Sequence, residues 1–212
     1  MQISARNLEV LDGAQLSAST FGLGNAGDVI LEIEELARFA GVDPIDGNPS
    51  GAFSRTDSDE EGQGGDVQIS ARNLEVVDGA QLSASTFGSG DAGDVILEIE
   101  ELAQFAGVDP NDGSSSGAFS NIDRDGVGTG GNVQISARNL EVLDGAELSA
   151  STFGAGNAGS VILEIEELAH FAGSSSGASS RIQENGKGCK IARTSAPESR
   201  QLRQVNRMNL GT

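Results

Sequence analysis

The chain has 212 residues, enough for one or two ordinary domains, and its formal net charge is −19. It contains 30 glycines and eight phenylalanines but neither tryptophan nor tyrosine, so any core must consist mainly of small aliphatic side chains with glycine at the corners. This composition favours a solenoid over an ordinary globule. Residues 1–180 carry six cations against thirty acids, which argues against nucleic-acid binding by this region.

Cysteine content and hydropathy narrow the possibilities further. Cys189 is the single cysteine, so an intrachain disulfide is excluded. No stretch approaches the roughly 20 apolar residues of a membrane helix, and no charged-then-apolar leader opens the sequence. We therefore expect no membrane insertion and no export signal in the chain as given.

A long repeat organises the sequence. Near-identical copies of QISARNLEVLDGAQLSASTFG begin at the evenly spaced positions Gln2, Gln68 and Gln134. Met1 takes the position of Val67 and Val133, so we hypothesise that the chain is a fragment of a longer array. In-frame codons for more repeats just upstream in the genomic DNA would support this hypothesis, and their absence would contradict it.

The repeat divides the chain into regions and turns. We expect a repeat region at 1–188, with units 1–66, 67–132 and 133–188, and a divergent basic tail at 189–212. Each full unit splits again into a shorter and a longer turn, which in the second unit run from Asp66 to Asp94 and from Asp94 to Asn132. The chain then holds about six turns.

In the shorter turn, aliphatic and polar residues alternate in three short runs separated by Asn73 and by Asp78-Gly79. This alternation predicts three strands, each with one buried face. Such a triplet cannot bury that face alone, but turns stacked at roughly 4.8 Å would share one core. The sequence therefore predicts an all-β fold, a parallel β-helix of about six turns.

The segment VILEIEELARFAG from Val29 fits two structures. Asp28 could cap a short amphipathic helix that ends at Gly41. The segment also follows Gly-Asp in register with the strand VQISA, and its start is rich in Val, Ile and Leu, so we favour a strand.

The inserted loops and the phenylalanines also follow the repeat. Segments 41–54 and 107–120 are rich in Pro, Asp, Gly and Ser, and the third copy lacks six of these residues, which indicates a surface loop. The eight phenylalanines fall in three aligned columns, and we expect them to pack in the core. The columns are Phe21, Phe87, Phe153; Phe39, Phe105, Phe171; and Phe53, Phe119.

Glycine-rich segments at 22–27, 88–93 and 154–159 match G-x-G-x-x-G. A dinucleotide site needs this motif inside a doubly wound domain, for which the spacing of the repeat leaves no room. We interpret the segments as corners between turns, where Asn25, Asp91 and Asn157 tolerate unusual backbone angles.

Acidic loops at 54–66 and 121–132 offer oxygen ligands of the kind that calcium takes. Neither loop matches the spacing of a known calcium motif, so a solvated acidic loop is the alternative. The candidate calcium ligands are Asp57, Asp59, Asp123 and Asp125. We expect no other cofactor.

The recurrent SASTFG segment predicts a polar strip along one side of the stack. Its hydroxyls could contact sugars or a partner surface, and a plain solvent-facing strand is the alternative. The candidate binding residues are Ser17, Ser19, Thr20, Ser83, Ser85, Thr86, Ser149, Ser151 and Thr152.

Catalysis finds little support in the residues. The single histidine, His170, takes the position of Arg38 and Gln104, which indicates a tolerant, exposed site. The acidic run at Glu32 to Glu35 recurs in every unit and is best explained as a solvated outer face. No cluster is singular in the way that an active site should be, so we expect no enzyme.

The repeat sequence resembles that of a known protein family. NLEVLDGAQLSASTFGxGNAGDV, followed by a loop and SGAFS, resembles the repeats of filamentous haemagglutinin-like proteins, in particular large cyanobacterial surface proteins of the two-partner secretion type, over about residues 1–188. The resemblance implies a right-handed parallel β-helix, a dedicated outer-membrane transporter, a secreted or cell-surface location, and adhesion to surface glycans or proteins. It implies no catalytic residues.

The chain also departs from this family. The amino-terminal secretion domain is absent from the sequence given, and the tail from Cys189 breaks the repeat. Two other hypotheses therefore stay open: a carbohydrate-active β-helix enzyme, and a non-functional fragment whose end turns pair edge to edge.

Overall fold

The computed structural model describes residues 1–22, 24–56 and 62–184. Within these residues every regular element is a β-strand, and all strand pairs are parallel. Six long strands form one sheet, called sheet A here. They are β1 (Gln2–Leu11), β3 (Val29–Ala40), β5 (Val67–Val77), β7 (Val95–Ala106), β10 (Val133–Leu143) and β13 (Val161–Ala172).

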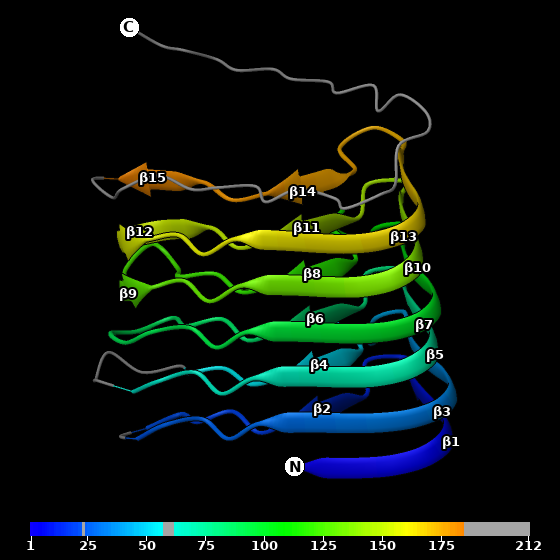
Figure 1. Ribbon diagram of the computed structural model, residues 1–212. Helices are drawn as coiled ribbons and strands as arrows, with labels where there is room; N and C mark the ends of the chain where they lie inside the picture. Colours follow the sequence, from blue (N-terminus) through cyan, green and yellow to red (C-terminus); the bar gives the residue numbers. More distant parts are fainter. Residues whose placement is uncertain (23, 57–61, 185–212) are drawn as a thin grey trace, which may run out of the picture.

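Short strands form two further sheets. Sheet B contains β2 (Gln15–Ser17), β4 (Gly51–Phe53), β6 (Gln81–Ser83), β8 (Gly117–Phe119), β11 (Glu147–Ser149) and β14 (Gly177–Ser179), and sheet C contains β9 (Val127–Thr129), β12 (Thr152–Asn157) and β15 (Ile182–Glu184). In Figure 1 the six turns lie one above another, and each long strand curves at one edge before the chain passes to sheet B. The expected all-β fold of stacked parallel strands is confirmed.

The strand register agrees with the shorter and longer turns read from the sequence. Val67 lies opposite Val95 across the shorter turn, and Val95 lies opposite Val133 across the longer one. The segment that also fitted a helix is the strand β3, as favoured. Its start pairs with both neighbouring turns, so its backbone N–H and C=O groups are satisfied by the sheet.

Asn73 does not separate two strands, which corrects the expectation of three strands in the shorter turn. β5 continues through it, and the register shifts between Ala71 and Asn73. The reason is a β-bulge: Arg72 of the shorter turn faces both Glu100 and Glu101 of the longer one. The bulge accommodates the extra residue without ending the strand.

Stacking places the aliphatic columns in one continuous core. Val95, Leu97 and Ile99 are buried, as are the residues in register with them on β3, β5, β10 and β13. Alternate residues of the same strands, such as Glu98, are exposed, so each strand has the one buried face that its alternation predicted.

Only one of the three phenylalanine columns contributes to this core, and its last member, Phe171, is 40% exposed, contrary to the prediction. Phe39 and Phe105 are fully buried within it. Phe53 is buried outside it, with the Arg55 guanidinium 4.0 Å from the centre of its ring. Phe21, Phe87 and Phe153 are exposed, which corrects the prediction that all three columns pack inside. Phe21 and Phe87 lie in bends directly after Thr20 and Thr86, where alternation no longer fixes the face of the next side chain. Phe153 lies within β12, where alternation places Thr152 inward and Phe153 outward.

Tight turns at Asp-Gly lead the chain from sheet A to sheet B. At Asp78-Gly79 both residues have positive φ, 55° and 89°, and the N–H of Ala80 donates to the carbonyl of Val77 at 3.2 Å. Positive φ at both central positions is typical of a type I′ turn. Asp12-Gly13 and Asp144-Gly145 repeat this geometry.

Candidate binding surface

The hydroxyl strip is largely buried, which corrects the picture of a solvent-facing strand. Ser17 is exposed and Ser19 and Thr20 are half-buried in the first turn. The six equivalent residues deeper in the stack are all less than one tenth exposed: Ser83, Ser85, Thr86, Ser149, Ser151 and Thr152. The next turn covers them, so their hydroxyls cannot form a wet strip over those turns.

These hydroxyls instead join one turn to the next. Ser83 Oγ donates to Ser85 Oγ at 3.0 Å, and Ser85 Oγ accepts the backbone N–H of Asn121 from the following turn, also at 3.0 Å. Thr56 and Thr86 share a buried hydroxyl–hydroxyl bond of 2.7 Å. The strip therefore satisfies backbone donors that lie beyond the regular ladder of sheet B.

The acidic loops differ in how much of them can be described. Asp57 and Asp59 lie outside the described residues, as do Cys189 and the tail 189–212. Asp123 and Asp125 are exposed, and the Asp123 carboxylate accepts the backbone N–H of Arg124 at 2.7 Å. In the described part of the chain no three His, Cys, Asp or Glu side chains cluster as a metal site would require. Calcium binding stays a prediction.

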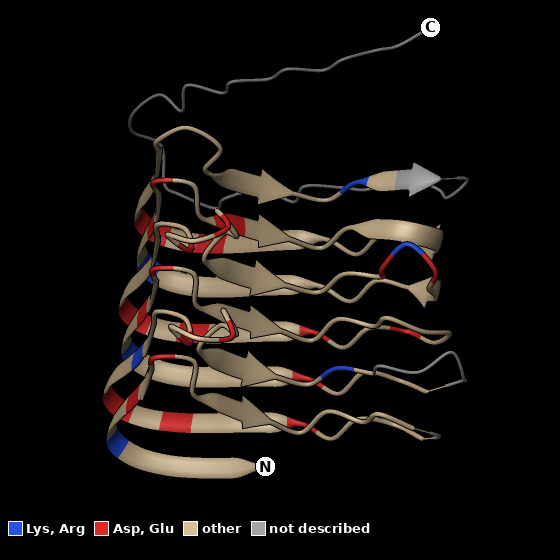
Figure 2. Cartoon of the chain, turned by 180° about the vertical axis from the view of Figure 1, so that it is seen from behind, with Lys and Arg blue, Asp and Glu red and all other residues tan. Residues whose placement is uncertain are grey.

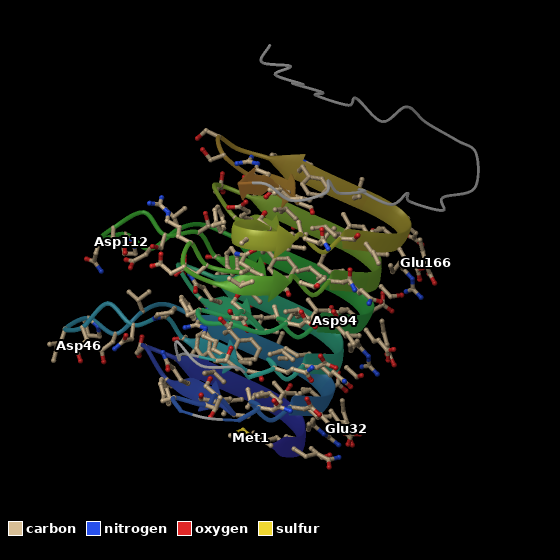
Figure 3. All side chains as sticks on the ribbon, turned by 90° about the vertical axis from the view of Figure 1, so that its left-hand side faces the viewer. Met1, Glu32, Asp46, Asp94, Asp112 and Glu166 are labelled. Carbon is tan, nitrogen blue, oxygen red and sulfur yellow. The ribbon has the colours of Figure 1, made fainter. Side chains whose placement is uncertain are left out.

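The inserted loops project from the stack, as predicted for segments that the core does not need. Asp46 and Asp112 mark their outer ends in Figure 3. Within the first loop the Asp43 carboxylate accepts the backbone N–H groups of Ile45 and Asp46, at 2.7 and 3.0 Å. The hydrogen bonds from Asp46 and Ile45 hold the pKa of Asp43 below its usual value. The N–H of Ser114 lowers the pKa of Asp112 in the same way.

The G-x-G-x-x-G segments are corners at which the backbones of successive turns touch. A Cβ on Gly90 would lie 1.8 Å from the carbonyl oxygen of Gly62, and a Cβ on Gly156 equally close to that of Gly128. Only glycine fits such an approach.

The polar residues of these corners act differently from the prediction. Asn25 and Asp91 do not have positive φ. Their side chains accept backbone N–H groups from the following turn, Asn25 from Gln63 at 3.0 Å and Asp91 from Thr129 at 2.7 Å. Asn157, the third residue predicted to tolerate unusual angles, has no positive φ either.

Charged side chains form an alternating column along the curved edge of sheet A, which we call the Arg–Glu ladder. Arg72 lies between Glu35 of the turn before and Glu100 of the turn after, at 2.6 and 3.6 Å. Arg138 repeats this arrangement with Glu101 and Glu166. Figure 2 shows acidic and basic residues together on this edge. An alignment of VQISARNLEVV with VILEIEELAQFA would have found the ladder, because the second segment has one extra residue and each Arg then falls opposite a Glu-Glu pair.

An open groove of about 1200 Å³ crosses the outer face of sheet A beside this ladder. All six long strands contribute, with Ser4, Glu32, Ser70, Glu98, Ser136 and Glu164 in register along it. Glu32 and Glu166 lie on this side in Figure 3. The lining therefore repeats from turn to turn and is acidic. His170 is exposed, as expected. It pairs with Glu141, which pairs on its other side with Gln104.

A second, smaller hollow of about 280 Å³ lies over sheet B and combines aromatic and polar side chains. Phe87 and Phe153 line it together with Asp123, Asn121 and Arg55. The sequence prediction assigned both phenylalanines to the core and did not single out Arg55 or Asn121. The missed signal is that TFG precedes a glycine corner in every unit.

We compared the chain with models of protein families, with curated proteins and with solved structures. None of the three comparisons finds a match. Among the described residues, no helix is long and apolar enough to cross a membrane.

Proposed function

We propose that this chain is a non-catalytic, adhesin-like binding module, a right-handed parallel β-helix from a secreted or cell-surface protein. The observation that carries the proposal is the repetition of the outer surface. The arginines of the Arg–Glu ladder and the exposed phenylalanines recur on every second turn, and serine alternates with glutamate along the groove.

A repeated surface of this kind suits binding of an extended partner better than catalysis at a single active site. An active site needs a few groups in a unique constellation, whereas a stack of like turns presents the same groups many times. The resemblance to filamentous haemagglutinin-like repeats supports the same proposal, including a dedicated outer-membrane transporter for export. We further propose surface glycans or proteins as partners, with no role for nucleic acid or membrane insertion.

The acidic groove favours a second candidate, a carbohydrate-active enzyme, because Glu98, Glu100 and Arg138 line it together. Against this candidate, each residue type of the groove recurs at an equivalent position in another turn. The equivalent pairs include Ser70 with Ser136, Glu32 with Glu98, and Arg6 with Arg138. The groove therefore contains several equivalent groups of side chains, whereas an active site would have one unique group.

A binding experiment separates the two candidates. The purified chain is applied to a glycan array and to immobilised cell-surface material, and soluble polysaccharides are then incubated with it and assayed for new reducing ends. We expect binding with no new reducing ends. Shortening of any polymer would favour the enzyme, and absence of binding to every glycan and surface would overturn the adhesin proposal.

A further inference from the structure

Three exposed phenylalanines form a column along the stack. Phe21, Phe87 and Phe153 are 77, 40 and 36% exposed, although Phe39 and Phe105 of the core are fully buried. Three consecutive repeats thus expose an aromatic ring to water. This is unusual, because a buried ring would stabilise the fold and an exposed ring does not.

The spacing of the column follows from the bridges beneath it. Parallel bridges link Thr20 to Thr56, Thr56 to Thr86, Thr86 to Ile122, and Ile122 to Thr152. The phenylalanines follow the first, third and fifth of these residues, so they stand two turns apart, about 9.6 Å at the usual strand separation. The N–H groups of Phe87 and Phe153 donate to the turn before, at 2.9 and 2.8 Å, which holds the backbone of both residues in place.

A carboxylate stands between the two rings of the second hollow. Asp123 follows Ile122, so it lies one turn after Phe87 and one turn before Phe153, and its N–H donates to the carbonyl of Thr86 at 2.9 Å. Asp123 is exposed and lines the hollow with both rings. The equivalent residue 57 lies outside the described residues.

We propose that Phe21, Phe87, Asp123 and Phe153, which we call the Phe–Asp column, bind a linear, neutral β-1,4-linked polysaccharide that runs along the stack. The proposal rests on the proposed binding function and names its ligand class. The apolar C–H faces of alternate sugars pack on the rings, since alternate sugars of an extended β-1,4 chain present the same face at a spacing close to the two-turn separation of about 9.6 Å. The Asp123 carboxylate accepts hydroxyl hydrogens of the sugar between them.

Charge and donor chemistry decide against other extended ligands. The net charge of −19 disfavours sulfated or uronic-acid polymers, against which the lining of the hollow supplies one cation, Arg55, beside Asp123. An extended peptide strand repeats its side chains on one face about every 6.7 Å, which does not fit the column. A run of prolines repeats about every 9.3 Å and fits the spacing, so donor chemistry distinguishes it: proline has no N–H to donate to Asp123, whereas each sugar offers several hydroxyls.

The test uses the full chain, with cellohexaose and chitohexaose as probes in isothermal titration calorimetry. Laminarihexaose, whose β-1,3 chain curves, an oligogalacturonate and a proline decamer serve as comparison ligands. We expect measurable binding of at least one β-1,4 hexasaccharide and at least tenfold weaker binding of all three comparison ligands. Equal or tighter binding of any comparison ligand would overturn the assignment of the ligand class.

Variants test the site itself. The double variant Phe87→Ala, Phe153→Ala should lose binding at least tenfold, and Asp123→Ala severalfold, with circular dichroism spectra unchanged because all three side chains are exposed. Phe171→Ala, which removes a ring 40% exposed in another column, is the matched control and should bind normally. The comparison of laminarihexaose with the β-1,4 hexasaccharides uses the unchanged chain. It therefore tests the proposal even if a variant fails to fold.

The outcomes separate this proposal from the general one. If the chain binds array glycans but the double variant binds them equally well, the Phe–Asp column is not the site and the adhesin proposal stands. If the chain binds neither β-1,4 hexasaccharides nor any other surface, both proposals fail.

Discussion

Nη1 of Arg72 lies 2.6 Å from Oε2 of Glu35, and this ion pair joins the third turn of the stack to the second. The contact exists because a bulge places one residue of the shorter turn opposite two of the longer turn. The same register brings Arg138 beside Glu101. The ladder thus places a cation between the acid pairs of successive long turns.

Removal of this cation should cost little stability, and the cost should depend on salt. We expect Arg72→Gln to lower the free energy of unfolding by about 1 kcal/mol or less at low ionic strength, because both partners are nearly half exposed. Urea denaturation in dilute buffer and in about 1 M NaCl measures the difference, which should shrink at high salt. Arg6→Gln is the control, since its 3.7 Å pair with Glu34 is largely exposed. A loss that salt leaves unchanged would point to packing instead of charge.

Glycine at the corners is required by contact between backbones. Gly90→Ala should destabilise the chain by about 3 kcal/mol or more, because the new methyl group meets the Gly62 carbonyl and φ is +143°. Gly22→Ala, where nothing lies within 4 Å, should leave the melting temperature nearly unchanged. Thermal unfolding followed by circular dichroism measures both variants. Similar melting temperatures for the two would show that the corner can relax.

The core phenylalanine column offers a comparison within one set of equivalent residues. Phe105→Ala should cost about 3 to 5 kcal/mol, because the ring is fully buried. Phe171→Ala should cost much less, since this ring at the last turn is 40% exposed. Urea denaturation curves of both variants give the difference. Equal costs would mean that Phe171 is covered in solution.

The buried Thr56–Thr86 bond predicts non-additive effects. Thr86→Val leaves the Thr56 hydroxyl without this buried partner and should cost about 1 to 3 kcal/mol. The double variant Thr56→Val, Thr86→Val should cost clearly less than the sum of the single variants. A double-mutant cycle by chemical denaturation tests the coupling, and strict additivity would rule out a direct hydroxyl–hydroxyl interaction.

The inserted loop should respond to acid. The backbone donors of Asp46 and Ile45 hold the pKa of Asp43 below its ordinary value in the folded chain. Because the folded-state pKa is lowered, the ionised carboxylate stabilises the loop at pH values above the unfolded-state pKa. This contribution disappears as the pH falls through the folded-state pKa. NMR titration of the Asp43 carboxyl carbon measures the shift, with Asp43→Asn as the assignment control. An ordinary pKa would mean that the two hydrogen bonds do not persist in solution.

Much of the fold could be predicted from the sequence. The repeat predicted the alternation of shorter and longer turns, and with it the pairing of Val67 with Val95 and of Val95 with Val133. The period-two pattern predicted the burial of Leu97 and Ile99, because a strand in a stack of like turns can bury only one face. The inserted loop was predicted to lie outside the core because the third copy lacks six of its residues.

Tertiary structure decided what covers each position. Ser83 and Phe87 are neighbours in one polar-looking segment, yet the serine is buried beneath the next turn and the phenylalanine is exposed. Alternation along a strand shows which face a side chain takes, but coverage depends on residues a full turn away in the sequence and on how the backbone bends at each corner. The sequence by itself therefore determined the turns and their register, while the bulge at Arg72, the buried hydroxyls and the exposed Phe–Asp column were decided by contacts between turns.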